Sequence, residues 1–195
     1  PAFPRRGNGR GGQARARHYL KKERLSMEIT LEKVEAQGQI DTLCALAEKI
    51  WHMTYDPLLP EGQVEYMLDK FQSDHAVKEQ MARQGYRYYL MMCDGMAAGF
   101  VGFSPRYEGR DEMFLSKVYL LPGYRGRGAV KAAFALVEEQ ARQEGLPAIR
   151  LTVNKGNTHA VEVYEHYGFV VADKVQSDIG GGYVMDDFIM VKTLG

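Results

Sequence analysis

The sequence predicts an α/β protein in which a mixed sheet of seven strands carries helices on both faces. The first indication is the order of strand-like and helix-like segments along the chain, which is β-α-α-β-β-β-α-β-α-β-β. The second is Asp94-Gly95, which lies between two apolar runs and is typical of a two-residue hairpin turn. The third is the strand–helix–strand unit over 112–153, which should be parallel and right-handed.

The first elements follow from hydrophobic periodicity. Alternation of apolar and polar residues over 27–34 predicts a half-buried strand. Apolar residues at helical spacing predict a helix over 40–55, and Asp41 suits its positive N-terminal end. Two prolines interrupt the pattern, after which a second helix is expected over 61–71 and a short third one over 73–84.

The central strands are expected at 86–93 and 96–104, on either side of the hairpin turn. A polar turn over 107–111 then leads into a strand over 112–121. The remaining elements alternate, and they are expected as a helix at 129–144, a strand at 148–153, a helix at 157–167, and strands at 169–175 and 183–192. Gly145, with Pro147 just beyond, and Gly168 are plausible helix ends.

Composition limits the class of protein. The 195 residues are enough for one domain with a real core, and the 45% hydrophobic content is ordinary for a globular chain. Cys44 and Cys93 lack the spacing of a metal site or a disulfide framework, so we expect no metal and a cytoplasmic location. No apolar run approaches the ~20 residues that would cross a membrane, so no membrane partner is expected.

Charge divides the chain at Met27. Residues 1–26 hold eight Lys or Arg and one acid, whereas 27–195 hold 17 basic and 24 acidic residues, a net charge of −7. The basic segment has little to bury, so we expect 1–26 to be a disordered tail, a cloning remnant or upstream read-through. Such a tail can bind RNA electrostatically, but the acidic remainder argues against a nucleic-acid partner.

The segment around residue 125 carries the most functional information. A strand-like run from Val118 to Leu121 ends at a proline, a loop with glycines at 123, 126 and 128 follows, and a helix begins at Ala129. Small residues let the backbone approach a ligand, and the free N–H groups of a first helical turn attract an anion. The loop is therefore either a phosphate site, with Arg125 and Arg127 adding charge, or an ordinary glycine-assisted helix start.

Two motifs together resemble those of the GNAT superfamily of acetyl-CoA-dependent N-acetyltransferases. The first is the loop Arg125-Gly126-Arg127-Gly128-Ala129-Val130, which departs from the family pattern where Val130 replaces a small residue. The second is Asn157-x-x-Ala160-x-x-Val163-Tyr164-Glu165-x-x-Gly168-Phe169. The resemblance covers 27–195. Ile50-Trp51-His52-x-Thr54-Tyr55 and the segment from Met185 to Lys192 are similar to the spermine/spermidine-acetyltransferase-like branch.

The resemblance implies acetyl-CoA as the cofactor and a mixed, mostly antiparallel seven-stranded sheet in which a central pair of parallel strands splays apart. The pyrophosphate of acetyl-CoA would lie on the loop formed by Arg125, Gly126, Arg127, Gly128, Ala129 and Val130. Its pantetheine arm would pair with the backbone of Val118, Tyr119 and Leu120. Asn157 would lie near that arm, although an asparagine there can also simply cap its helix.

The same resemblance makes Tyr164 the general acid that protonates the leaving thiolate. Spacing alone favours a core tyrosine beside Tyr167. The general base stays open: many relatives carry Glu where this chain has Ser116, and the other candidates are His52, Asp111, Glu112 and Glu162.

The acceptor pocket should form between the first two helices and the bend near residue 180. The residues expected to contact the acceptor are Trp51, Tyr55, Ser116 and Asp186, with His52, Tyr183 and Asp187 nearby. Aromatic residues four positions apart are as often core packing as ligand contacts.

The leading hypothesis is an N-acetyltransferase acting on a small primary amine, with polyamines as candidates. The alternatives are acetylation of a protein or peptide amine, and a CoA-binding sensor without catalysis. A homodimer is expected if 183–192 forms an edge strand that needs covering.

Overall fold

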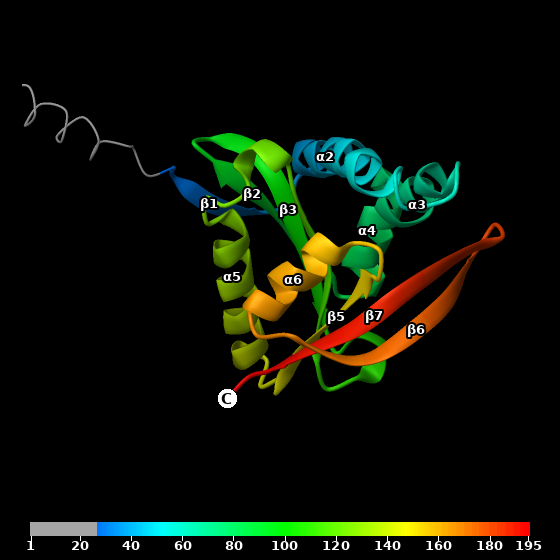
Figure 1. Ribbon diagram of the computed structural model, residues 1–195. Coiled ribbons are helices and arrows are strands. Elements are labelled where there is room, and N and C mark those ends of the chain that lie inside the picture. The colour runs from blue at the N-terminus through cyan, green and yellow to red at the C-terminus, as the bar shows by residue number, and fades with distance from the viewer. Residues whose placement is uncertain (1–26) are drawn as a thin grey trace, which may run out of the picture.

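Residues 27–195, which the computed structural model describes, form one seven-stranded sheet in the order β1-β2-β3-β4-β5-β7-β6 (Figure 1). The tail expected over 1–26 lies outside these residues. Every neighbouring pair of strands is antiparallel except β4 and β5, so the predicted mixed, mostly antiparallel sheet is confirmed. The strands are β1 Ile29–Lys33, β2 Arg87–Cys93, β3 Met96–Pro105, β4 Met113–Leu120, β5 Ala148–Asn154, β6 Val170–Gly180 and β7 Tyr183–Thr193.

Helices cover both faces of the sheet, as predicted. They are α2 Gln37–Tyr55, α3 Gln63–Gln72, α4 Asp74–Arg83, α5 Ala129–Gln143 and α6 Thr158–His166. One face packs on α5 and α6 through a core that includes Phe103, Phe134 and Leu151, while the other packs on α2 and α4 through a core that includes Tyr88 and Phe100 (Figure 1). Within 27–195, no helix combines the length and the apolar character needed to cross a bilayer.

The parallel pair β4–β5 is joined only at its beginning. Met113 pairs with Ile149 and Phe114 with Arg150, and beyond these positions the two strands separate. A register shift against β3 also leaves Ser116 without a partner, which is a bulge in β4. The remaining edge of β4 therefore presents N–H and C=O groups toward the gap, where a ligand can pair with them.

The expectation that 183–192 forms an edge strand is wrong. β7 pairs with β5 on one side and with β6 on the other, so β6 and β1 are the edges. The reason is the register of the last hairpin: β6 runs to Gly180, five residues beyond its expected end, and its return strand inserts beside β5. The argument for a homodimer from an uncovered β7 edge therefore falls away.

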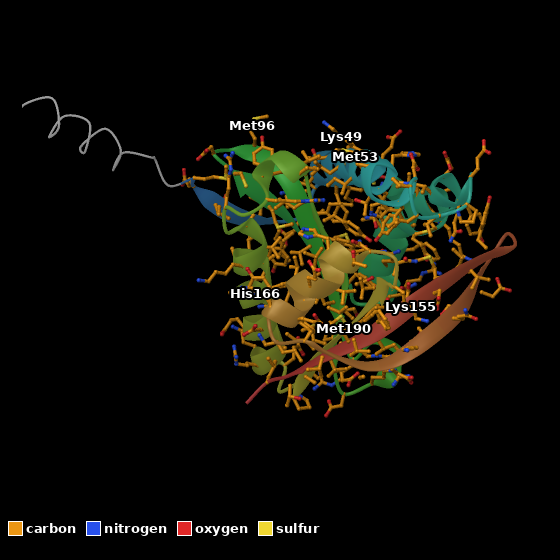
Figure 2. The ribbon with its side chains drawn as sticks, in the orientation of Figure 1. Lys49, Met53, Met96, Lys155, His166 and Met190 are labelled. Atoms are coloured by element: carbon orange, nitrogen blue, oxygen red, sulfur yellow. The ribbon has the colours of Figure 1, made fainter. Side chains whose placement is uncertain are left out.

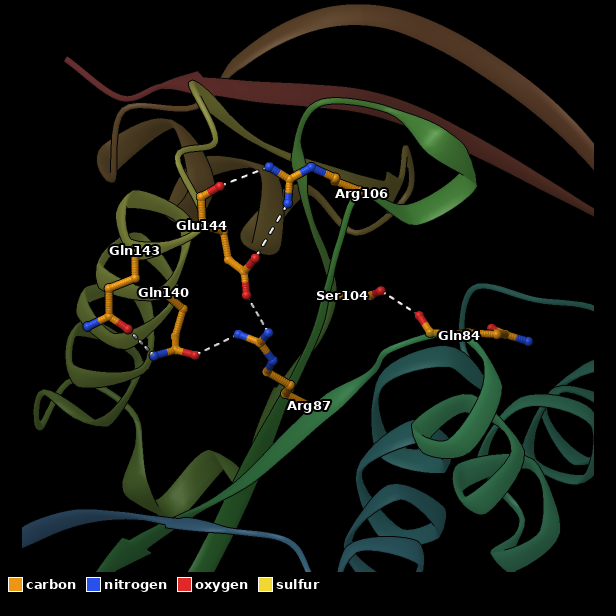
Figure 3. Close-up of polar contacts among 7 residues, drawn as sticks. All are labelled: Gln84, Arg87, Ser104, Arg106, Gln140, Gln143 and Glu144. Carbon is orange, nitrogen blue, oxygen red and sulfur yellow. Dashed lines mark hydrogen bonds and ion pairs between the residues drawn. The ribbon is translucent and has the colours of Figure 1, made fainter.

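A polar cluster fixes the C-terminal end of α5 against the sheet (Figure 3). The guanidinium of Arg87 donates to Gln140 at 2.8 Å and to Glu144 at 2.5 Å. Arg106 donates to the backbone carbonyl of Glu144 at 2.9 Å. Hydrogen bonding and charge from Arg87 hold the pKa of Glu144 below its usual value. Anchoring this end sets the direction of α5, so that its N-terminus lies beside the gap between β4 and β5.

Candidate active site

A cleft of about 1550 Å³ opens where β4 and β5 separate. Its walls come from α2, α3, β4, the loop before α5, α6 and β7. Ligand pockets for one small molecule are commonly ~300–1,000 Å³, so this cleft has room for a cofactor and an acceptor together. The position matches the splayed pair of strands, 112–121 and 148–153, that the family resemblance implies.

The glycine loop forms the wall at the N-terminus of α5. Gly126 and Gly128 have φ values of 72° and 99°, which favour glycine, and Gly128 leaves the helix without a side-chain cap. The first-turn N–H groups are therefore available to an anion. The loop residues that line the cleft are Arg125, Gly126, Gly128, Ala129 and Val130. Arg127 is not among its lining residues.

The edge of β4 and the start of α6 form the next part of the wall. Val118, Tyr119 and Leu120 line the cleft along the unpaired side of β4. Asn157 also lines it, while its side-chain oxygen accepts a hydrogen bond from the backbone of Ala160 at 3.3 Å. The asparagine therefore caps α6 and faces the cleft at once, so the two interpretations of this residue are compatible.

Three phenols lie at the centre of the cleft. The hydroxyls of Tyr55 and Tyr119 are 3.2 Å apart, and Tyr164 lines the same cavity from α6. Burial raises the pKa of Tyr164, and the neighbouring Tyr55 raises it further. Its ring packs against Phe134 and Phe169, with centroids 6.0 and 5.8 Å apart. Tyr164 is therefore both a packed residue and a protonated phenol, which is the form a general acid requires.

A buried carboxylate faces these phenols from β7. Asp187 is 8% exposed and lines the cleft, and its Oδ1 has no hydrogen-bond partner within 27–195. Burial raises the pKa of Asp187 to about 6; the charge of Asp186 raises it too, while Lys155 lowers it. An unpartnered buried carboxylate is costly, and such groups gather where a ligand completes them.

Asp186, the residue chosen from the sequence, does not line the cleft. Its carboxylate forms an ion pair with Lys155, which lies between β5 and α6 next to β7 (Figure 2). Neighbouring residues of a strand point to opposite faces, so only one of this acidic pair can face the cavity. The structure brings Asp187 to the phenols instead.

The other expected acceptor residues are divided. Trp51, Tyr55 and Ser116 all line the cleft, and the rings of the first two meet edge to face at 6.1 Å. Of the proposed bases, Glu162 lines it. The other candidate bases, His52, Asp111 and Glu112, do not line the cleft. His52 pairs with Asp56 at 3.1 Å, Asp111 pairs with Arg106 at 3.7 Å, and Glu112 lines a smaller cavity. Tyr183, expected near the acceptor, instead donates to the Glu61 carbonyl at 3.4 Å.

Sequence reasoning missed Lys117 altogether. This lysine of β4 lines the cleft with its ammonium 5.2 Å from the Trp51 ring centroid and 5.8 Å from that of Phe71. Burial lowers the pKa of Lys117 to about 8. Its signal was present in the sequence, because it is a lysine inside an otherwise apolar strand, two positions before Tyr119 and so on the same face.

Comparison with known proteins places this site in a family. The model of the acetyltransferase (GNAT) family matches residues 47–169. The chain therefore belongs to the GNAT family and is an N-acetyltransferase of that type.

Individual relatives agree with this assignment. The chain is 28% identical over 155 residues to an N-acetyltransferase of Mycobacterium bovis, covering 79% of this chain and 97% of the relative. It is 24% identical over 153 residues to a spermidine N(1)-acetyltransferase of Thermoplasma acidophilum, covering 78% and 94%. Among solved structures, the PaiA N-acetyltransferase of Thermoplasma acidophilum in complex with coenzyme A matches with a TM-score of 0.71 and 23% identity, covering 86% and 100%.

Proposed function

We propose that the chain transfers the acetyl group of acetyl-CoA to the primary amine of a small-molecule acceptor. The observation that carries this proposal is that Tyr164 and Asp187 line the same cleft. The first is a protonated acid and the second an unpartnered carboxylate. A transfer from sulfur to nitrogen needs one group that gives a proton and another that takes one.

The cofactor would extend from the glycine loop to the phenols. Its pyrophosphate would accept hydrogen bonds from the N–H groups that follow Gly126 and Gly128, aided by the dipole of α5. Its pantetheine amides would pair with the edge of β4 over 118–120. Pairing through the main chain makes few demands on side chains, so the bulkier Val130 is compatible with binding.

The acceptor amine is the more demanding partner. A primary amine with a pKa near ~10.4 is almost fully protonated at pH 7, and forming its neutral state costs roughly 4–5 kcal/mol. Asp187 would accept that proton directly or through a water. The neutral nitrogen then forms a bond to the acetyl carbon while the carbon–sulfur bond breaks. Tyr164 would give its proton to the departing thiolate and regain one from the nitrogen, which must lose its second proton to form the amide, while Asp187 would release the first proton to water. A backbone N–H of β4 would polarise the thioester carbonyl.

The proposal is tested by thiol release from acetyl-CoA in the presence of a panel of amines. Spermidine belongs in the panel because one relative carries that substrate in its name. A peptide with a free lysine represents the protein-directed alternative. Thiol release with small amines supports the proposal. Release with none of the panel, although coenzyme A binds, would instead make the chain a CoA-binding sensor.

One further expectation concerns the cellular location of the enzyme. Cys44 and Cys93 are both free thiols, which suits a reducing compartment, and we propose a cytoplasmic location on that basis.

A further inference from the structure

The far end of the acceptor side carries two lysines around one aromatic ring. Lys117 reaches the ring of Phe71 from β4, and Lys70 reaches it from α3, with ammonium–centroid distances of 5.8 and 5.4 Å. Both lysines line the cleft. Lys70 and Lys117 therefore make this end of the cavity positively charged inside an aromatic wall, and we call these two ammonium groups the positive pole.

No carboxylate of the described chain neutralises this pole. Lys70 donates to the Ile179 carbonyl and to the Tyr66 hydroxyl, while Lys117 has no hydrogen bond or ion pair within 27–195. Asp69 and Glu79 also line the cleft, but neither forms an ion pair with the two ammonium groups. Lys117 thus keeps a charge in a partly desolvated position, which is unfavourable until an anion arrives.

An orphaned donor lies beside Lys117. The indole N–H of Trp51 is buried and has no acceptor within the described residues, and the Lys117 ammonium lies 5.2 Å from the centre of that ring system. Buried polar groups are nearly always hydrogen-bonded. The indole N–H is therefore a second polar group of this wall that lacks a partner within the described residues.

The negative pole lies at the other end of the same aromatic wall. The Trp51 ring contacts those of Tyr55 and Tyr119, with centroids 6.1 and 5.4 Å away. Burial raises the pKa values of both phenols, and the nearby charge of Asp187 raises them further. Along this wall the cavity therefore runs from an unpartnered carboxylate to an unpartnered ammonium.

We propose that the acceptor is an amino-acid-like amine that also carries a carboxylate, with its ammonium at Asp187 and its carboxylate at Lys117. The inference rests on the proposed function and narrows its substrate class. A polyamine would place a second positive charge against Lys117, where like charges repel. A carboxylate would neutralise the Lys117 ammonium instead.

Matched pairs of acceptors test this directly, because each pair differs only by a carboxylate: ornithine and putrescine, lysine and cadaverine, phenylalanine and phenethylamine. Phosphoethanolamine against ethanolamine shows whether phosphate can replace the carboxylate. For at least one pair, kcat/KM of the native enzyme should be 10-fold or more higher for the carboxylated member, about the scale of one charge-assisted hydrogen bond. Equal or better use of every decarboxylated partner would overturn the inference.

Substitution of Lys117 links that preference to its cause. Lys117→Met removes the charge at similar length and should lower the carboxylate preference about 10- to 100-fold. Lys117→Gln should do the same, and it serves if the methionine variant folds poorly. Lys49→Met, on the exposed side of α2 (Figure 2), is the matched control and should leave the preference unchanged. A preference retained in both Lys117 variants would contradict the assignment of the anion to this residue.

Different results would refute the carboxylate inference and the proposed N-acetyltransferase function. Rapid acetylation of spermidine, with every amino acid slower, would refute the carboxylate inference and leave the N-acetyltransferase proposal standing. Absence of thiol release with every amine, spermidine included, would refute the proposed function itself.

Discussion

Replacing Asp187 by Asn should raise the free energy of unfolding while lowering the acetyltransferase activity. Burial raises the pKa of Asp187 from an ordinary 3.8 to about 6, so the fold favours the neutral carboxyl. A shift of about two pKa units corresponds to about 3 kcal/mol at ~1.4 kcal/mol per unit. Asparagine has the same shape and cannot ionise. The native protein should therefore be less stable than Asp187→Asn wherever Asp187 is charged.

The pH dependence of this stability difference follows from the protons that the folded and unfolded chains bind. Below pH ~4 the carboxyl is neutral in both folded and unfolded chains, so the two proteins should be about equally stable. Between pH ~4 and ~6 the unfolded chain ionises while the folded one keeps its proton, so the native protein loses stability across this range, and the loss is complete above pH ~6. At pH 8 the gain from Asp187→Asn should approach 3 kcal/mol, reduced by the cost of burying an amide with incomplete hydrogen bonding.

Urea denaturation of both proteins at pH ~3.5 and pH ~8 measures this difference. The free energies of unfolding should agree within about 0.5 kcal/mol at the lower pH and differ by about 1–3 kcal/mol at the higher one. Asp186→Asn is the matched control, because that carboxylate is paired with Lys155 and outside the cleft. A difference that is independent of pH, or a less stable Asp187→Asn at pH 8, would refute the reasoning.

Other outcomes follow from the site. Tyr164→Phe should lower kcat about 10²- to 10⁴-fold with coenzyme A affinity kept, and an unchanged rate would exclude this phenol as the acid. In the native enzyme kcat/KM should fall below pH ~6 as Asp187 takes a proton, and this limb should be absent from the residual activity of Asp187→Asn. Gly128→Ala, at a φ of 99°, should weaken coenzyme A binding measured by calorimetry. Gly102→Ala would place a Cβ 2.4 Å from the Tyr88 ring, so its melting temperature should drop by several degrees.

Much of the fold was readable from local signals. Asp94-Gly95 fixes the β2–β3 hairpin, since Asp94 and Gly95 have the positive φ values such a turn requires. The loop glycines at 126 and 128 likewise mark a conformation that few other residues adopt. These features depend on a few neighbouring residues, and for that reason the sequence alone was sufficient to predict them.

Features set by long-range pairing were less accessible. Whether Asp186 or Asp187 faces the cleft depends on the register of β7 against β5, where Asn154 pairs with Asp187. A shift of one residue would exchange their roles. The place of β7 inside the sheet, and the approach of Lys117 to rings from α2 and α3, arise from the same non-local packing and leave little local trace.

The central claim is that the gap between β4 and β5 holds the thioester between Tyr164 and Asp187. A crystal structure with bound coenzyme A tests it most directly. We expect the pyrophosphate on the amides after Gly126, the pantetheine paired with 118–120, and the sulfur within hydrogen-bond reach of the Tyr164 hydroxyl. A nucleotide bound outside the cleft, or a thiol pointing away from both side chains, would contradict the account.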